Sequence, residues 1–260
     1  PILFLMYIND LDVAILSADN EIFISKFADD TKLGRKIASV SDCLILQRGI
    51  DKLSRWCLDW GMSLHPDKCV VLHFGRKNPN YDYTIDNILI KSECVARDLG
   101  VLVSDDCKPS MHVQKVAKKA HVVLSQVRRA IKLRNSKTLL PIYKSFIRPL
   151  LESSVQAWNP AKRADVDTLE KVQKRAVRLM SDQSSRSYED RLSNLQLQSL
   201  EDRRHRGDMI ETFKIIHGHN DVAAEGLFSF VRDRHNKDTR SFAENRLVPA
   251  HKKKNSEFVC

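Results

Sequence analysis

The spacing of apolar residues changes a little before the middle of the chain. Up to about residue 107, short runs of β-branched and aromatic residues alternate with turn-forming pairs such as Asp86-Asn87, which is typical of strands and hairpins. From residue 112 onward, apolar residues recur every three or four positions, which is typical of amphipathic helices. The pattern predicts an α+β region followed by an all-helical region.

The first region is expected to contain two helices and several strands. Residues 3–16 are apolar enough to form a buried helix, and residues 22–36 are expected to form a β-hairpin. Residues 40–62 form an amphipathic pattern in which Trp56 and Trp60 share one stripe, so core packing is favoured over base stacking. Further strands are expected over 70–74, 83–90 and 94–103.

Two adjacent acids, Asp29 and Asp30, are expected at the tip of the hairpin. Strand side chains alternate between faces, so neighbouring acids can act together only where the chain turns. Mg²⁺ prefers carboxylate oxygens, and two-metal phosphoryl-transfer sites are bridged by acids from more than one strand. Asp-Asp is also a common turn and N-cap pair. The acids alone leave both a metal site and a plain turn open.

The second region predicts a bundle of three helices, 112–131, 139–150 and 165–180, followed by a helix over 200–216. The second of these is expected to turn Phe146 inward and to stop at Pro149 and Glu152. Residues 108–214 carry 23 Lys and Arg against 11 Asp and Glu, a net charge of +12 within a chain of net charge +10. A phosphate backbone is the natural partner of such a block, and a solvated helical face is the alternative. The basic residues on the polar arcs are Lys115, Lys118, Lys119, Arg128, Arg129, Lys171, Lys174, Arg175 and Arg178.

Six cysteines lack the spacing of a zinc site, which predicts reduced thiols and an intracellular protein of the cytoplasm or nucleus. His217-Gly218-His219 is expected in a loop without a metal, since two His at i and i+2 lie on different faces of a helix. No apolar run reaches about 18 residues, and the first residues lack the features of a signal peptide, so no membrane partner is expected.

Four segments, in this order, resemble the reverse transcriptase of a LINE-type, jockey-like non-LTR retrotransposon. Pro1–Leu11 resembles the end of the template-contacting motif, and Phe27–Leu33, with Phe-Ala-Asp-Asp, resembles the metal-binding hairpin. Pro66–Cys69 resembles the turn that enters a strand through a Lys. Asp98–Val101, followed by His112, resembles the hairpin that grips the primer and the start of the thumb. Their order along the chain carries the resemblance.

The resemblance implies a partial polymerase palm over residues 1–107, with an antiparallel sheet and packed helices. It implies a helical thumb and connection over 108–220 and a poorly ordered tail over 221–260. Asp29 and Asp30 would ligate Mg²⁺, and the nine basic residues would contact an RNA template and a DNA primer. Lys68 would stabilise charge on, or protonate, the pyrophosphate leaving group of a deoxynucleoside triphosphate, with a plain surface Lys as the equal alternative. Phe27 would lie near the primer terminus or be buried under the hairpin.

The family's other catalytic Asp and its template-contacting glycines precede the segment that resembles this chain. Asp10 matches a helix and is not an expected ligand. The chain is therefore expected to be a fragment that binds Mg²⁺ poorly and is inactive alone. The alternative function is a non-catalytic nucleic-acid-binding relic of a decayed element. An uninterrupted upstream frame with an Asp-bearing strand would favour the enzyme, and stop codons would favour the relic.

Overall fold

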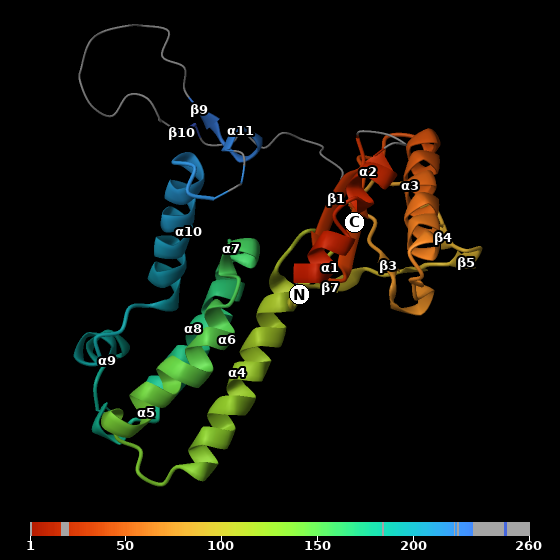
Figure 1. Cartoon of the computed structure of the whole chain (residues 1–260). Coiled ribbons are helices and arrows are strands. Elements are labelled where there is room, and N and C mark those ends of the chain that lie inside the picture. Colours follow the sequence, from red (N-terminus) through yellow and green to blue (C-terminus); the bar gives the residue numbers. More distant parts are fainter. Residues whose placement is uncertain are drawn as a thin grey trace, which may run out of the picture. The chain divides into compact units, whose positions relative to one another are not determined.

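The computed structural model describes residues 2–16, 21–183, 185–220, 222, 224–230 and 247–248. Its elements are mixed α and β, mostly helical with small two-stranded sheets (Figure 1). The described residues fall into two units, with the boundary between Lys108 and Pro109. An α+β first region and a helical second region are thus both present.

The first unit combines three α-helices with short strands. Its helices are α1 (Ile2–Tyr7), α2 (Leu11–Leu16) and α3 (Val40–Asp59), with a 3₁₀ turn at Pro66–Lys68. Its strands are β1 (Phe23–Phe27), β2 (Asp30–Gly34), β3 (Val70–Val71), β4 (Thr84–Ile85), β5 (Ile88–Leu89), β6 (Lys91–Ser92), β7 (Val95–Asp98) and β8 (Val101–Ser104).

Helix α3 forms where the 40–62 pattern predicted it. Its first turn is fixed by Asp42, whose carboxylate accepts the backbone N–H groups of Ala38 and Ser39 at 3.0 and 2.9 Å and the Ser39 hydroxyl at 2.8 Å. These hydrogen bonds lower the pKa of Asp42 to about 2, with the Ser39 hydroxyl as the largest cause. Gly61, with φ +68°, follows the last turn and lets the chain leave the helix.

The prediction of one buried helix over 3–16 is wrong. The stretch breaks into α1 and α2, and α1 buries none of its residues, with Leu3 82% exposed. The segment is apolar on all sides, so it lacks the polar face that sets the orientation of an amphipathic helix. The break is held from the neighbouring strand, because the Lys26 ammonium donates to the Ile8 carbonyl at 3.0 Å.

The strands pair two by two and do not join into the single antiparallel sheet that was expected. The pairs β1–β2, β4–β5 and β7–β8 are antiparallel hairpins, and β3–β6 is parallel. Asp86 and Asn87 turn the second hairpin, as the sequence predicted for this pair, and both have positive φ. Each ladder is short, so the unit depends on helix packing for its core.

The core of the first unit lies between α2, α3 and the strands, and Figure 1 shows α3 beside the β1–β2 hairpin. Trp56 is buried there, as expected. Trp60 is 46% exposed, yet its ring lies edge-on to Tyr7 at 4.9 Å. The expected core stripe is therefore confirmed at Trp56 and reaches the surface at Trp60.

The second unit is built from helices. They are α4 (Ser110–Ala130), α5 (Ser136–Ile142), a π-helical turn (Tyr143–Ile147), α6 (Arg148–Glu152), α7 (Val155–Trp158), α8 (Arg163–Arg178), a 3₁₀ turn (Ser181–Gln183), α9 (Tyr188–Asn194), α10 (Leu200–Ile216) and α11 (Ala224–Leu227). A short ladder pairs β9 (Ser229–Phe230) with β10 (Leu247–Val248). Most of the expected tail, 231–246 and 249–260, lies outside the described residues.

The second helix of the bundle departs from its prediction. Helix α5 continues through the π turn into α6, which contains Pro149 within its first two positions and ends at Glu152. Pro is tolerated there because the first N–H groups of a helix have no intrahelical partner. A π turn adds a residue per turn and shifts the apolar phase. Phe146 is 64% exposed, so its expected inward position is wrong.

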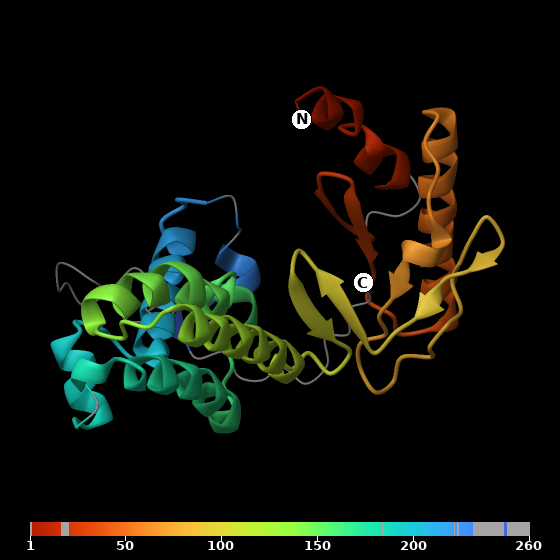
Figure 2. The same ribbon diagram turned by 90° about the horizontal axis from the view of Figure 1, so that it is seen from below.

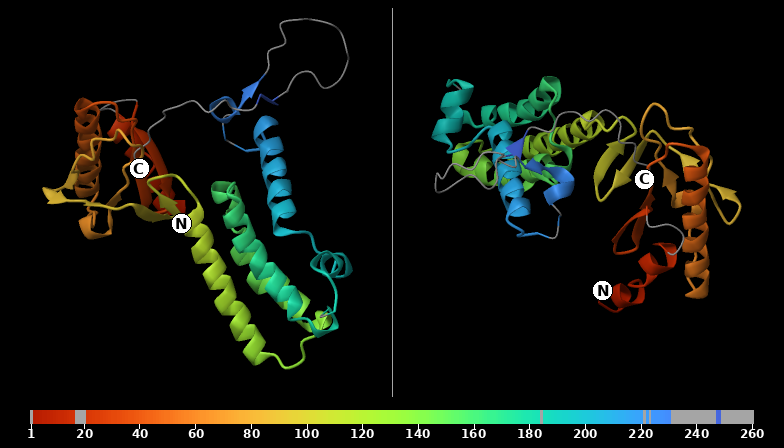
Figure 3. Two further views of the ribbon diagram at one scale, coloured as in Figure 1. Left: turned by 180° about the vertical axis from the view of Figure 1, so that it is seen from behind. Right: turned by 90° about the horizontal axis from the view of Figure 1, so that it is seen from above.

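Helices α4 and α8 pack side by side in the second unit, with α6 and the π-helical turn also against α4 (Figures 2 and 3). The buried residues of α4 recur at helical spacing, and those of α8 include both apolar and polar side chains. The fully buried Leu151 and Leu169 come from α6 and α8. This packing fixes which polar sides of α4 and α8 meet at the surface.

Candidate functional site

The two acids lie at the tip of the β1–β2 hairpin, as the sequence predicted. Phe27 pairs with Asp30, so Ala28 and Asp29 form the connecting turn. Ala28 has φ +52°, in the left-handed region that is unfavourable for residues other than glycine. Asp29 stands in the turn and Asp30 begins β2, and both are exposed. The turn releases these two acids from the strict alternation of a strand.

Lys26 on β1 and Lys32 on β2 form ion pairs with other carboxylates, so neither lysine neutralises the two acids at the tip. The Lys26 ammonium lies 3.0 Å from the Asp12 carboxylate, and the Lys32 ammonium lies 2.5 Å from that of Asp98. Among the described residues, neither Asp29 nor Asp30 has a side-chain hydrogen bond or ion pair. The hairpin is thus fixed from both sides while its tip presents two uncompensated carboxylates.

Lys68 and Phe27 are both at the surface of the first unit. Lys68 ends the 3₁₀ turn with an exposed side chain, and no contact among the described residues joins it to either acid. Phe27 is 63% exposed. Burial under the hairpin is therefore wrong for Phe27, and its place near a primer terminus stays a prediction.

The nine basic residues of the second unit are all exposed. Lys118, Arg129 and Lys171 line an open groove between α4 and α8. The Lys174 ammonium lies 4.9 Å from the centre of the Tyr188 ring, and Arg128 lines a different cavity. Burial lowers the pKa of His112 and of His121, and Lys115 and Arg175 respectively lower them further. The remaining two basic residues are Lys119 and Arg178.

The groove between α4 and α8 has a volume of about 650 Å³. Its lining contains three cations, one imidazole and no acid: Gln114, Ala117, Lys118, His121, Val122, Ser125, Arg129, Thr168 and Lys171. Burial lowers the pKa of His121, and the positive charge of Arg175 lowers it further. At neutral pH the groove therefore combines fixed positive charge with a neutral imidazole.

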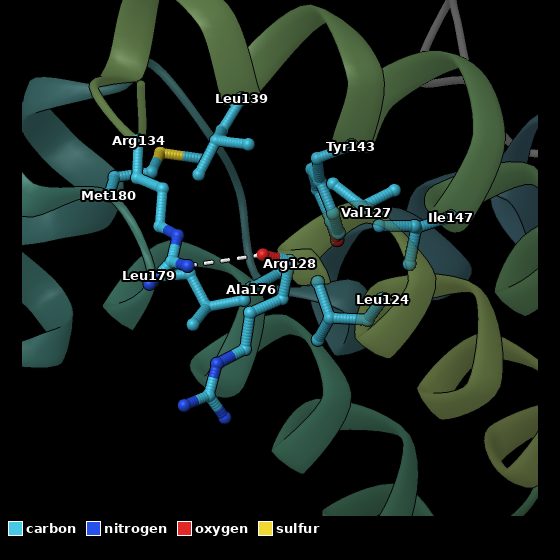
Figure 4. A pocket seen from close by; sticks show the side chains of 10 residues that line it. All are labelled: Leu124, Val127, Arg128, Arg134, Leu139, Tyr143, Ile147, Ala176, Leu179 and Met180. Carbon is cyan, nitrogen blue, oxygen red and sulfur yellow. Dashed lines mark hydrogen bonds between the residues drawn. The ribbon is translucent and has the colours of Figure 1, made fainter. Parts of the chain in front are cut away.

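A second cavity lies inside the bundle and is apolar. Leu124, Tyr143 and Ala176 are among its lining residues, with two arginines at the rim (Figure 4). The Arg134 guanidinium donates to the Arg128 carbonyl at 3.1 Å, which closes one side. Its volume of about 10 Å³ has room for one water at most. It is a packing defect and not a ligand site.

A buried polar network in the second unit was not predicted. The Glu170 carboxylate accepts the backbone N–H of Leu200 at 3.0 Å and the Gln173 amide at 3.2 Å, and Tyr188 donates its hydroxyl to the same group. Tyr143 donates to the Gln173 carbonyl oxygen at 2.5 Å. Glu170 and Gln173, three positions apart in the predicted helix 165–180, were the sequence feature that could have indicated this network.

Neither the cysteines nor the paired histidines form a metal site among the described residues. Cys43, Cys57, Cys69, Cys94 and Cys107 are free thiols, and Cys260 lies outside the described range. His217 and His219 follow α10 and stack on the Phe213 ring with centroids 4.0 and 6.0 Å away. None of the described helices is both long and apolar enough to cross a bilayer.

Comparison with known proteins finds distant relatives of this chain. No protein-family model and no solved structure matches the chain. The RNA-directed DNA polymerase from mobile element jockey of Drosophila melanogaster is 22% identical over 189 residues, covering 70% of this chain and 21% of the relative. The chain is a distant homologue of the RNA-directed DNA polymerases of non-LTR retrotransposons. It spans about a fifth of the length of the curated relatives it matches.

Two further relatives carry similar descriptions. The RNA-directed DNA polymerase from mobile element jockey of Drosophila funebris is 23% identical over 175 residues, covering 63% of this chain and 18% of the relative. The probable RNA-directed DNA polymerase from transposon BS of D. melanogaster is 21% identical over 195 residues, covering 70% and 21%. The resemblance to jockey-like reverse transcriptases is confirmed.

Reverse transcriptases as a family use Mg²⁺, and the hairpin tip fits this ion in part. Asp29 and Asp30 offer the hard oxygen ligands that Mg²⁺ prefers. Among the described residues, no group of three or more His, Cys, Asp or Glu could hold a metal ion. The described residues therefore provide two candidate ligands and do not complete a two-metal site, which takes acids from more than one strand.

Proposed function

We propose that this chain is the palm and thumb part of an RNA-directed DNA polymerase. Residues 1–107 are the palm part, and residues 108–220 are the thumb and connection. The proposal rests on one observation: a chain homologous to such polymerases carries two uncompensated carboxylates, Asp29 and Asp30, on the tip of a hairpin anchored by Lys26 and Lys32.

In this function the chain's residues bind and orient the reacting groups. Asp29 and Asp30 would hold divalent metal, which supplies activation of the primer hydroxyl and neutralisation of the developing charge. Lys68 would add positive charge near the pyrophosphate leaving group. The basic residues of the thumb would contact phosphates of the RNA–DNA duplex without reading base sequence.

The test supplies the upstream part of a related polymerase and then removes a hairpin carboxylate. The chain would be fused in frame behind the part of the jockey polymerase that precedes the matched segment. We expect the fusion to extend a DNA primer on an RNA template with Mg²⁺, and Asp29→Asn to abolish extension, because phosphoryl transfer depends on positioning and electrostatics. The 260-residue chain alone should be inert.

The matched control is Asp105→Asn, which removes one member of another adjacent acid pair in the first unit. It should leave extension unchanged. Extension by the isolated chain, or by the fusion carrying Asp29→Asn, would contradict the proposed role of the hairpin.

A second function, nucleic-acid binding without catalysis, is favoured by the groove between α4 and α8, which needs no metal. It predicts that the fusion stays inert while the chain binds nucleic acid. The salt dependence of binding should then survive Asp29→Asn, since the acids of the first unit make no phosphate contact in that function.

A further inference from the structure

Helix α10 has a second apolar side besides the one that packs on the bundle. Its inner side carries the buried Leu200 and Arg204 and lies against α7 and α8. Met209, Ile210 and Phe213 lie on the other side, and each of them is 47–72% exposed. Large apolar side chains that gather on one exposed face mark an interaction surface.

The spacing of the side chains along this face is symmetric. Its members follow one another at steps of four, three, one, three and four positions, which keeps them on one side of a helix with about 3.6 residues per turn. We call them the α10 stripe: Asp202, Arg206, Met209, Ile210, Phe213 and His217. The stripe has the same spacing when it is read backwards, so two copies of it match when the two helices run antiparallel.

An antiparallel pair of stripes brings complementary groups together. Met209 meets Met209 of the second copy at the centre. Arg206 lies opposite Phe213 of the second copy, where a guanidinium over an aromatic ring is attractive, and Asp202 lies opposite His217. A parallel pair would instead set Arg206 against Arg206 and Asp202 against Asp202, which is repulsive. The charges of the stripe therefore favour a second, antiparallel copy of the same helix.

The aromatic end of the stripe is held in place within each copy. The His217 Nδ1–H donates to the Phe213 carbonyl at 2.9 Å, since a carbonyl oxygen can only accept. The His217 ring stacks on the Phe213 ring with centroids 4.0 Å apart and planes 25° apart. Phe213 is thus fixed before any partner arrives, which reduces the conformational entropy lost on binding.

We propose that the α10 stripe is the interface of a homodimer, in which two copies of the chain pack α10 antiparallel about a two-fold axis. The same residues serve on both copies, as in other two-fold symmetric dimers, and the axis passes between the two Met209 side chains. The stripe covers fifteen steps of the helix, about 22 Å at 1.5 Å per residue. Such a small contact gives a weak, reversible dimer. The proposal does not depend on the polymerase function.

The experiment is sedimentation equilibrium of the whole chain over a concentration series, in which the wild type should show a reversible monomer–dimer equilibrium. Met209→Glu sets two carboxylates against each other across the axis, and Met209→Lys does the same with two ammonium groups. Each change should raise the dissociation constant at least about 10-fold, because like charges that face each other across an interface are strongly unfavourable. Since Met209 is exposed in the single chain, both variants should keep the wild-type circular dichroism spectrum.

Mixing the variants tests the two-fold symmetry. An equimolar mixture of Met209→Glu and Met209→Lys, with a fluorescent label on one of them, should form a heterodimer, because opposite charges then meet at the axis. The matched control places the same two changes at Leu133, another exposed apolar residue of the second unit. Each Leu133 variant should dimerise like the wild type.

A second pair of variants tests the register. Phe213→Lys sets an ammonium against Arg206 of the second copy and should weaken the homodimer. Arg206→Glu removes the guanidinium from the Phe213 ring and should also weaken it. A mixture of the two variants should dimerise more tightly than Phe213→Lys alone, because it forms one Glu–Lys pair and keeps one Arg–Phe pair.

Several results would overturn the proposal. They are a wild-type chain that stays monomeric over the whole series, a dimer that Met209→Glu leaves unchanged, a mixture of the Met209 variants that stays monomeric, and Leu133 variants as monomeric as the Met209 variants. A monomeric wild type that adsorbs to phosphatidylcholine vesicles through Met209 would assign the stripe to a lipid surface and would overturn it as well.

Discussion

Lys32 and Asp98 join two hairpins of the first unit. Lys32 stands two residues after Asp30 on β2, and its ammonium lies 2.5 Å from the carboxylate of Asp98 at the end of β7. Asp98 is followed by Leu99 and Gly100, both of which have positive φ and turn the β7–β8 hairpin. The pair therefore connects the strand that begins with a candidate metal ligand to the hairpin that resembles the primer grip.

This connection is expected to be measurable as a coupling energy. In a double-mutant cycle with Lys32→Gln and Asp98→Asn, urea unfolding should give a coupling of about 0.5–1 kcal/mol, the upper range for a partly exposed pair. Lys91 and Glu93 form a pair in which the lysine is 75% exposed, and their cycle should give a value near zero. Equal values for the two cycles would mean that Lys32 and Asp98 do not fix the hairpin.

A second prediction concerns Glu170, whose buried carboxylate joins α8 to the start of α10. Glu170→Ala would leave the Leu200 N–H and the Tyr188 hydroxyl without their acceptor, whereas the Gln173 amide would keep the Gln198 carbonyl. Each unsatisfied buried group costs about 1–3 kcal/mol, so the loss should exceed 2 kcal/mol in chemical unfolding. Glu189→Ala, an exposed change on α9, is the control and should stay within about 0.5 kcal/mol. A similar loss in both variants would show that the network does not stabilise the fold.

Sequence reasoning identified the long periodic helices well. Helix α10 has the predicted bounds, and α8 starts two residues before its predicted start. Long helices can be predicted because many apolar positions share the helical spacing. The hairpin turn at Asp86-Asn87 was also predictable, since these residues tolerate positive φ. Local chemistry decides such elements.

The departures come from contacts that a local pattern does not contain. The break between α1 and α2 is held by Lys26 from β1, and the phase shift at Phe146 comes from the π turn. The position of the candidate acids at a hairpin tip could be predicted, because a two-residue turn is determined by neighbouring residues in the sequence. The groove was not found, because it exists only where Ser125 of α4 and Thr168 of α8 are brought together by packing.

The third prediction concerns pH. His112 is buried, its ring lies 4.8 Å from that of Trp158, and burial, with Lys115 adding to it, lowers its pKa from 6.5. The unfolded chain therefore binds the proton more tightly than the folded chain. The free energy of unfolding should be highest above pH 6.5 and should fall as the pH drops below this value.

His112→Phe keeps an aromatic ring against Trp158 and removes the titration. Its unfolding free energy should depend less on pH between about 5 and 6.5 than that of the wild type. His205→Gln, an exposed change on α10, should keep the wild-type dependence. Parallel pH profiles for the wild type and His112→Phe, measured by urea unfolding, would assign the dependence to other groups.

The fourth prediction separates the two adjacent acid pairs of the first unit. Asp106 accepts the Ser104 hydroxyl at 2.7 Å and lies 2.7 Å from the Lys108 ammonium, and these contacts, Lys108 first, lower its pKa to about 2. Its oxygens are thus already occupied, whereas those of Asp29 and Asp30 are not. A divalent cation should therefore prefer the hairpin tip, although weakly, since two acids leave most of its coordination to water.

Paramagnetic broadening by Mn²⁺ measures this preference residue by residue. Amide signals around Ala28 should broaden at lower Mn²⁺ concentration than those around Cys107, and the double change Asp29→Asn, Asp30→Asn should remove the difference. The same double change at Asp105 and Asp106 should leave the broadening of the hairpin intact. Identical broadening of the hairpin in the wild type and in the Asp29→Asn, Asp30→Asn variant would remove the metal role from these acids, because the broadening would then not depend on their carboxylates.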